Sequence, residues 1–271
     1  MDIKIIVATH KKYRMPDDEI YIPVFAGASG EAPSGYVGDN TGDNISDKNK
    51  NYCELTALYW AWKNLNADYM GLVHYRRYLT LKGRAQGDGI ISSGGRDSRY
   101  AAILNKKDIE VILKDNDIIL PKPRHYVIET NYSQYANAHH AVDLDTVRSV
   151  ISDIYPEYLV AYDARMKMRT SHMFNMFIMK KSLLDEYCKW LFNILFELER
   201  RLDISKYSNY DARVFGFVAE RLLDVWLDKN FFKYKELPYI FMENEHRMKK
   251  VAGLIKRKLR NAIYRYWRFY R

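Results

Sequence analysis

The chain has 271 residues, of which 48% are hydrophobic and 14% aromatic, so it can bury a full core and is not a disordered protein. Its two cysteines exclude a disulfide-rich secreted domain, and no apolar run approaches the roughly 18 residues that span a bilayer. The net charge of +9 is concentrated in residues 247–271, which hold ten basic residues and no acid, so the near-neutral remainder argues against a nucleic-acid groove through the body of the protein.

The first predicted element is a central parallel strand over residues 3–9 (IKIIVAT), a continuous apolar run typical of a strand buried on both faces. Thr9 and His10 stand at its carboxyl end, where open α/β sheets bind their ligands. The run begins without a basic leader, an apolar core and a cleavage site, so we expect no secretory signal. A second, short strand is expected over residues 21–25, weakened by Pro23.

A long polar loop follows over residues 27–51, with five glycines. Gly and Asn allow tight turns whose exposed backbone N–H groups approach phosphate or ribose, which makes Asp43 and Asn44 candidate ligand residues. Carboxylates also bind hard divalent cations, although Asp39, Asp43 and Asp47 lack the spacing and closing Glu of an EF-hand. The alternative is a surface loop with capping residues. Because long loops inside a domain are uncommon unless functional, we favour a ligand-binding loop.

A helix is predicted from Asn51 to about residue 66, because its apolar residues keep a helical period. Asn51 can cap it, with Glu54 completing a capping box. Alternatively, this helix N-terminus points into the binding crevice and both residues contact the ligand. Strand, loop, helix and the strand that follows would then form one nucleotide-binding unit of βαβ type.

The next strand, over residues 69–73, ends abruptly in His74, Tyr75, Arg76 and Arg77. A guanidinium is a fork of donors that matches phosphate oxygens bidentately. Two arginines beyond a strand end therefore indicate an anionic ligand, most simply the diphosphate of a sugar nucleotide. The alternative is that both arginines pair with nearby carboxylates while the tyrosines pack.

The middle of the chain is expected to alternate helices and strands. Glycine-rich residues 83–99 predict either a lid over the site or a disordered loop. His139 and His140 are adjacent and so point in different directions on a helix, which makes them a poor metal clamp. Helices are expected at 107–116, 143–154 and 157–166, with a strand at 117–120.

Residues 171–179 predict a buried strand that begins with the polar His172. Asn175 stands among apolar residues, and because a buried amide needs partners, a sugar hydroxyl is one candidate. Helices are predicted from 183 to about 201 and from about 211 to 229, followed by an edge strand over 234–241.

Two carboxylates of the last helix are candidates for a general base. Asp211 lies at its start, where its alternative role is a helix cap. Glu220 lies in its middle and has the neighbouring Arg221 as an alternative partner. Either one matches the role that carboxylates play in glycoside chemistry.

The basic tail over residues 247–271 predicts an amphipathic helix. Its apolar residues fall at steps of three and four, and the basic residues fill most of the remaining face. Such a helix lies in the membrane interface, where each basic residue near an anionic surface adds about 1 kcal/mol. The alternatives are a helix docked on its own domain and an RNA-binding tail.

Taken together, six stretches resemble the bacterial capsular and exopolysaccharide biosynthesis glycosyltransferases long catalogued as a domain of unknown function, some of which transfer galactofuranose. They span roughly residues 3–245: 7–11 (VATHK), 42–46 (GDNIS), 51–60 (NYCELTALYW), 71–78 (GLVHYRRY), 172–177 (HMFNMF) and 212–217 (ARVFGF). The resemblance implies a nucleotide-sugar-dependent transferase in residues 1–246, with an A-type, Rossmann-like α/β fold of a mostly parallel sheet flanked by helices.

One departure concerns the metal. A-type transferases usually carry Asp-any-Asp after the strand that follows the nucleotide-binding helix, and here that place holds His74-Tyr75-Arg76. Cationic side chains can neutralise a leaving diphosphate without a metal. We therefore expect no cofactor, and Mn²⁺ is the less favoured alternative.

The resulting interpretation is a cytoplasmic glycosyltransferase, peripheral on the inner face of the plasma membrane, that extends a lipid-linked oligosaccharide. We expect its donor to be UDP-linked. Asp211 is the first candidate for the catalytic base and Glu220 the second, while His172 and Asn175 are expected near the transferred sugar or the acceptor. The donor is expected to contact Thr9, His10, Asp43, Asn44, Asn51, Glu54, His74, Arg76 and Arg77. Two other classes remain open: a nucleic-acid-binding protein that uses the basic tail, and a non-catalytic scaffold of the polysaccharide machinery.

Overall fold

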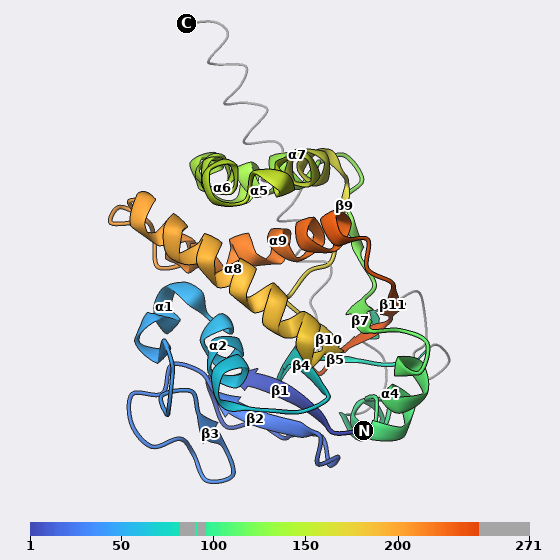
Figure 1. The fold of residues 1–271 in the computed structure, drawn as a ribbon. Coiled ribbons are helices and arrows are strands. Elements are labelled where there is room, and N and C mark those ends of the chain that lie inside the picture. The colour runs from blue at the N-terminus through green and yellow to red at the C-terminus, as the bar shows by residue number, and fades with distance from the viewer. Residues whose placement is uncertain (82–89, 92–95, 244–271) are drawn as a thin grey trace, which may run out of the picture.

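The computed structural model describes residues 1–81, 90–91 and 96–243. Over these residues the main path of the central sheet has the strand order β11-β7-β10-β4-β1-β2-β3 (Figure 1). Every neighbouring pair on this path is parallel except the two pairs that β10 makes. In chain order the strands are β1 (Ile3–Thr9), β2 (Tyr21–Phe25), β3 (Val37–Gly38), β4 (Tyr69–His74), β7 (Ile118–Pro121), β10 (Phe177–Lys180) and β11 (Tyr234–Leu237).

Shorter strands extend this sheet at its edge. The end of β4 turns back into β5, and β5 pairs with β12, which in turn pairs with β6. A separate two-stranded ribbon joins β8 and β9. The bounds are β5 (Arg77–Leu79), β6 (Ile90–Ile91), β8 (Arg124–His125), β9 (Thr170–Ser171) and β12 (Tyr239–Phe241).

Alternation along β1 divides the core between the two faces of the sheet. Ile5 and Val7 contribute to one apolar cluster, and Ile6 to the other, as the two-residue period of a strand requires. At the centre, Gly71 of β4 lets β10 approach closely, since a Cβ there would lie 2.8 Å from the carbonyl oxygen of Phe177. The apolar runs predicted as β1 and β4 are confirmed as buried neighbours.

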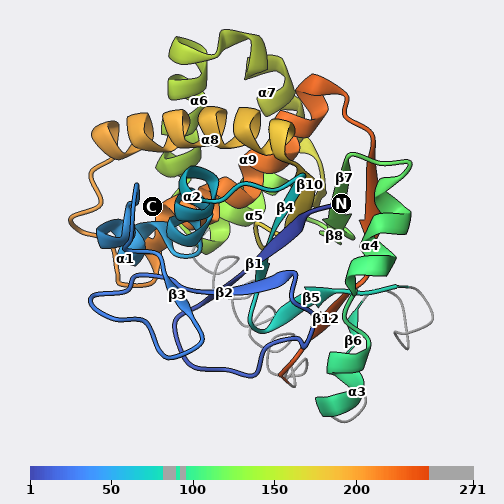
Figure 2. The same cartoon turned by 60° about the horizontal axis from the view of Figure 1, so that its bottom comes forward.

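Helices cover both faces of the sheet, more thickly on one (Figures 1 and 2). On the thick side, α2 and α8 contact the sheet, α9 packs beside α8, and α5, α6 and α7 lie outside them. Helix α4 covers the other face together with the short α3. The bounds are α2 (Leu55–Asn64), α3 (Arg96–Ala101), α4 (Lys106–Leu113), α5 (Asn131–Ala138), α6 (Ala141–Ile154), α7 (Leu159–Lys167), α8 (Lys181–Arg201) and α9 (Val214–Asn230). The predicted α/β architecture, a mostly parallel sheet flanked by helices, is confirmed.

Three predicted elements are divided in the structure. The helix predicted from Asn51 is two helices, α1 (Asn49–Tyr52) and α2, which are separated at Cys53 with a positive φ of 54°. The predicted capping box is wrong, because Asn51 lies inside α1 and the side chain of Glu54 makes no cap hydrogen bond. The strand predicted over 171–179 is interrupted by a turn at Phe174 and Asn175, and the strand predicted over 234–241 is divided into β11 and β12 around Pro238.

The long loop between β2 and α1 is held by the buried carboxylate of Asp39. This carboxylate accepts hydrogen bonds from the backbone N–H groups of Gly27 (2.9 Å) and Ala28 (3.1 Å) and from the hydroxyls of Ser46 and Thr56. It therefore ties the end of β2, the 3₁₀ turn at Ser46–Lys48 and helix α2 to one point. Both oxygens of Asp39 accept hydrogen bonds from these donors. Asp39 therefore has a structural role and does not serve as the cation ligand considered above.

Two predicted features lie wholly or largely outside the described residues. Most of the glycine-rich stretch 83–99 falls there, and so does the basic tail 247–271, so its amphipathic helix and the domain boundary at 246 stay predictions. Within the part of the chain that is described, no helix combines the length and hydropathy needed to cross a membrane.

Replacing Asp39 by Ala is expected to lower the free energy of unfolding by about 3 kcal/mol or more, because buried donors of the loop lose a charged acceptor. Urea denaturation measures this loss. The matched control is Asp43→Ala in the same loop, whose side chain is 58% exposed and which we expect to change stability by less than about 0.5 kcal/mol. Equal losses in the two variants would show that Asp39 does not anchor the loop.

Candidate active site

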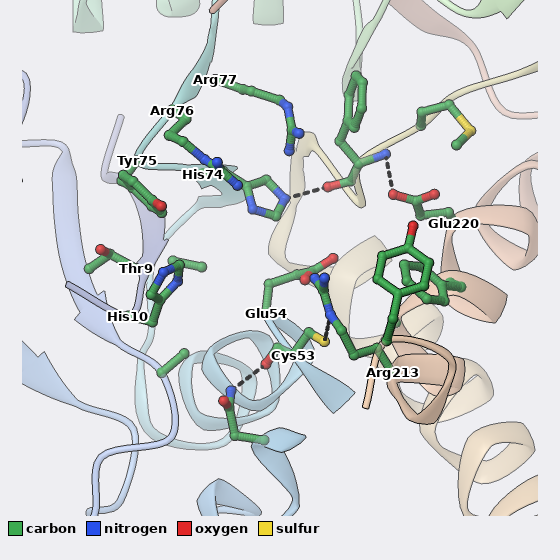
Figure 3. Close-up of a pocket in the computed structure, with 18 of the residues that line it drawn as sticks. Thr9, His10, Cys53, Glu54, His74, Tyr75, Arg76, Arg77, Arg213 and Glu220 are labelled. Carbon is green, nitrogen blue, oxygen red and sulfur yellow. Dashed lines mark hydrogen bonds between the residues drawn. The ribbon is translucent and has the colours of Figure 1, made fainter. Parts of the chain in front are cut away.

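A cavity of about 920 Å³ opens at the carboxyl ends of β1, β2 and β4. Its strand side is formed by residues that end or follow these three strands, and its other side by α5, α9 and the turn before β10. Figure 3 shows Thr9, His10, His74 and Arg76 on the strand side, Arg213 and Glu220 on the opposite side, and Glu54 between them. The cavity thus brings together seven predicted site residues: Thr9, His10, Glu54, His74, Arg76, Arg77 and Glu220.

Positive charge dominates the lining. Among the described residues that line the cavity, six carry a cationic group and two carry a carboxylate. Such a surface favours an anionic ligand, because the cations lower the energy of negative charge placed among them. The cations are Lys50, Arg76, Arg77, Arg124, Arg213 and Arg221, and the carboxylates are Glu54 and Glu220.

The two strand-end arginines are held differently. Arg76 is partly exposed, and its nearest acidic partner is Glu243 at 3.5 Å. The guanidinium of Arg77 lies 4.3 Å from the centroid of the Phe174 ring. This cation–π contact orients the guanidinium. A loose ion pair leaves Arg76 able to turn its donors toward a ligand at modest cost, because exposed pairs contribute little.

Both histidines on the strand side are uncharged near neutral pH. Burial lowers the pKa of His10, and the nearby charge of Arg76 lowers it further. Burial also lowers the pKa of His74, although the carboxylate of Glu54 opposes this shift. His74 Nε2 lies 2.6 Å from the carbonyl oxygen of Phe174, so its N–H donates there and Nδ1 is the acceptor nitrogen.

The turn at Phe174 and Asn175 connects three walls of the cavity. The Phe174 carbonyl accepts from His74, and its N–H donates to Glu220 Oε1 at 3.1 Å. The Asn175 side-chain amide donates to Glu54 Oε1 at 2.7 Å and to the Gly216 carbonyl at 3.2 Å. Both residues have positive φ, 79° and 51°, a conformation that L-residues rarely adopt outside functional sites and turns. In the structure the amide N–H group of Asn175 positions a carboxylate, and the sugar hydroxyl expected as its partner stays a prediction.

The carboxylate on α9 is suited to proton transfer. Burial raises the pKa of Glu220, and the charge of Glu54 acts in the same direction, whereas Arg221 opposes it. A raised pKa makes the carboxylate a stronger base than an exposed one. Glu220 therefore has both the position and the electrostatics of a group that exchanges a proton with a ligand.

Three residues on the side of the cavity opposite the strands, here called the far wall, were not predicted as site residues. Arg213 donates from Nε to Cys53 Sγ at 3.1 Å, and Arg221 donates to Gln134 Oε1 at 2.6 Å. His139 lies in the same wall. The one signal for Arg213 was its place in the stretch 212–217; Arg221 was seen only as a possible partner of Glu220.

Predicted donor residues of the long loop lie outside the cavity lining. The backbone N–H of Asp43 donates to Asn64 Oδ1 at 3.2 Å, and the Asn44 side chain closes a local turn by accepting from the Ser46 N–H at 3.1 Å. Asn51 donates to the Ala212 carbonyl at 2.6 Å and so joins α1 to the turn before α9. Their ligand-binding roles stay predictions, while each now has a structural contact.

His172 belongs to a buried ionic cluster that is separate from the cavity lining. Its Nδ1 contacts Asp224 and its Nε2 lies 3.1 Å from Glu236. Burial alone would disfavour the imidazolium, but the hydrogen bonds and charges of these two acids outweigh it and raise the pKa of His172. Arg165 completes the cluster, because its Nη1 lies 3.8 Å from Asp224 while its Nε donates to Asp228 at 2.7 Å. The cluster links α7, α9 and β11.

Asp211 also stands behind the cavity wall. It does not line the cavity, and its Oδ1 lies 3.3 Å from Nδ1 of His139, which does. A hydrogen bond from Ser208 (2.7 Å) lowers the pKa of Asp211, so its carboxylate is ionised. In this geometry Asp211 reaches the cavity through His139, and its catalytic role stays a prediction.

The cavity does not have the side chains of a divalent metal site. Within the described residues, no three His, Cys, Asp or Glu side chains are grouped to hold an ion. At the end of β4, where an acidic motif would be expected, the chain presents His74 and Arg76 to the cavity.

Substitutions at Asn175 test the left-handed conformation of the turn. Asn175→Ala is expected to be less stable than Asn175→Gly by about 1 kcal/mol, because Ala is strained at a φ of 51° and Gly is not. At the exposed helical control Lys189 the order is expected to reverse, with Gly the less stable by a similar amount. Urea midpoints of the four variants decide it. The same order at both sites would contradict the constrained turn.

The chain is similar to a solved glycosyltransferase structure. The solved apo structure of the WbbM bifunctional glycosyltransferase matches the chain with a TM-score of 0.82 and 32% sequence identity, over 90% of this chain. The match covers 46% of WbbM, so the chain spans less than half the length of that protein. Among curated protein sequences, none matches. A family model described as a domain of unknown function, DUF4422, matches residues 4–231, and the chain therefore belongs to the DUF4422 family.

Proposed function

We propose that the chain is a glycosyltransferase that uses a nucleotide-diphosphate sugar. The observation that carries this proposal is the cavity itself: cationic groups at the carboxyl ends of parallel strands face the partly buried carboxylate of Glu220 on α9. Support comes from the shared fold, since the similar structure is that of a glycosyltransferase. Parallel strand ends are also where α/β folds bind nucleotides.

In this proposal the strand side of the cavity binds the donor. Arg76 and Arg77 stabilise the negative charge that develops on the diphosphate as it leaves. The neutral His74, whose Nδ1 is an acceptor, suits a hydroxyl group of the donor. Thr9 and His10, at the end of β1, lie on the nucleotide side. The cationic wall supplies the charge that a metal ion supplies elsewhere, so we propose transfer without a divalent metal.

The reaction is a substitution at the anomeric carbon of the donor sugar. An acceptor hydroxyl forms the new C–O bond, the bond to the diphosphate breaks, and the hydroxyl proton passes to a base. Glu220 is the proposed base because it lines the cavity, its pKa is raised by burial, and Phe174 N–H fixes one of its oxygens. Glu54, held by Asn175, positions the sugar between donor and base.

The proposal also covers the identity of the donor and of the acceptor. We propose a UDP-linked donor, with galactofuranose as one candidate sugar, and a lipid-linked oligosaccharide of capsular or exopolysaccharide synthesis as the acceptor. The basic tail over residues 247–271 would hold the enzyme at an anionic membrane surface beside such an acceptor.

A thermal-shift screen against UDP, GDP, CMP and dTDP, each with EDTA and with Mn²⁺, tests the donor class and the metal together. We expect one nucleoside diphosphate to raise the melting temperature equally in both conditions, and sugar-nucleotide turnover to continue in EDTA. No shift with any nucleotide would contradict the proposed function. Strict dependence on Mn²⁺ would contradict only the metal-independent mechanism.

Arg76→Ala is expected to lower kcat by about 10²–10³-fold, because one donor to the developing charge is lost. The melting temperature should be unchanged, since Arg76 is partly exposed and its ion pair is loose. Arg148→Ala is the matched control, an exposed arginine that pairs with Asp163 away from the cavity lining. Turnover like that of the unsubstituted enzyme would show that Arg76 is structural.

A further inference from the structure

The far wall of the cavity contains an aromatic surface that the donor side does not use. Three rings meet there: His139 lies 4.2 Å from Phe217 with an interplanar angle of 24°, and 5.6 Å from Tyr210 with an angle of 21°. Tyr210 and Phe217 are 5.3 Å apart. All three residues line the cavity, and we call them the aromatic wall.

Tyr210 is the exposed member of this wall. It is 58% exposed, although it is large and largely apolar, whereas the other Tyr, Phe and Trp side chains of the described residues, apart from Phe231, are buried or partly buried. Its neighbours fix its place, because His139 and Phe217 both pack against it. An aromatic face that is presented to a polar cavity and supported from behind matches the apolar C–H face of a sugar ring.

The edge of the aromatic wall is polar. His139 Nδ1 lies 3.3 Å from Asp211 Oδ1, and Asp211 is itself held by Ser208. Burial keeps the pKa of His139 below its usual range, so the imidazole is neutral and donates Nδ1–H to Asp211. Its Nε2 is then an acceptor, which suits a hydroxyl group. Glu220 lies one helical turn beyond Phe217 on α9.

The charge distribution separates this wall from the donor. The arginines suited to the diphosphate, Arg76 and Arg77, follow β4 on the strand side. Tyr210 instead precedes α9, and Phe217 lies in its first turn. Figure 3 shows Glu54 between the two sides, and Glu220 on the side of α9. A ligand on the aromatic wall would therefore approach the donor sugar from the side of the proposed base.

We propose that the aromatic wall is a sugar subsite for the acceptor, in which the face of Tyr210 stacks on a hexose ring and His139 accepts a hydrogen bond from one of its hydroxyls. This inference rests on the proposed function, since it names the substrate class that the other half of the same cavity takes. It also gives Asp211 a defined part, which is to position His139.

Saturation-transfer NMR with a panel of methyl hexopyranosides and hexofuranosides, in the presence of saturating UDP, tests this subsite. For Tyr210→Ala we expect the affinity of the strongest glycoside to fall roughly three- to tenfold, because one stacking contact is lost. Tyr210→Phe keeps the ring face and should bind like the unsubstituted enzyme. Phe231→Ala is the control, since Phe231 is 91% exposed and does not line the cavity.

UDP affinity, measured by calorimetry on the same variants, separates the possible failures. An unchanged UDP affinity with weakened glycoside binding in Tyr210→Ala supports the subsite. A loss of UDP affinity in that variant would overturn the subsite and indicate that Tyr210 stacks on the nucleobase. Glycoside binding that no Tyr210 variant alters would also overturn the subsite. Absence of glycoside binding by an enzyme that binds UDP also overturns it, whereas glycoside binding without any nucleotide binding contradicts the proposed function alone.

Discussion

The arrangement of the cavity depends on the two left-handed residues before β10. Because β10 runs against its neighbours, its beginning lies at the same edge as the ends of β1 and β4. The turn at Phe174 and Asn175 therefore enters the ligand side of the sheet. Its backbone and one amide reach His74, Glu220 and Glu54 together. An extended backbone would hold the Phe174 N–H and C=O in the plane of the sheet and leave the histidine and the two carboxylates unconnected.

Much of the strand side could be predicted from the sequence, since its signals are local. Apolar runs locate β1 and β4, and polar residues directly beyond such runs must lie at the carboxyl edge of the sheet. Thr9, His10, His74, Arg76 and Arg77 follow from that rule alone, and all five line one cavity. The fold class follows from the same alternation of strands and helices.

Apart from Glu220, the far wall could not be predicted, because its signals are long-range. Asp211 reaches His139 across 72 positions, and Asn175 reaches Glu54 across 121. The break of the helix at Cys53 was equally hidden, since residues 51–66 keep a helical period throughout. The same limit explains the long loop: its acidic residues looked alike in sequence, and the burial of Asp39 alone distinguishes the one that anchors it.

The thiol at that helix break has a consequence for the chemical durability of the cavity. Burial, with the charge of Glu54, raises the pKa of Cys53 to about 11, against the smaller opposing effect of Arg213. At neutral pH only about one thiol in 10⁴ is then ionised, and the thiolate is the form that peroxides and alkylating agents attack. Cys188 is also buried with a raised pKa. The sulfur atom of Cys53 in the cavity wall is therefore present almost entirely as the protonated thiol, the form that oxidants attack most slowly.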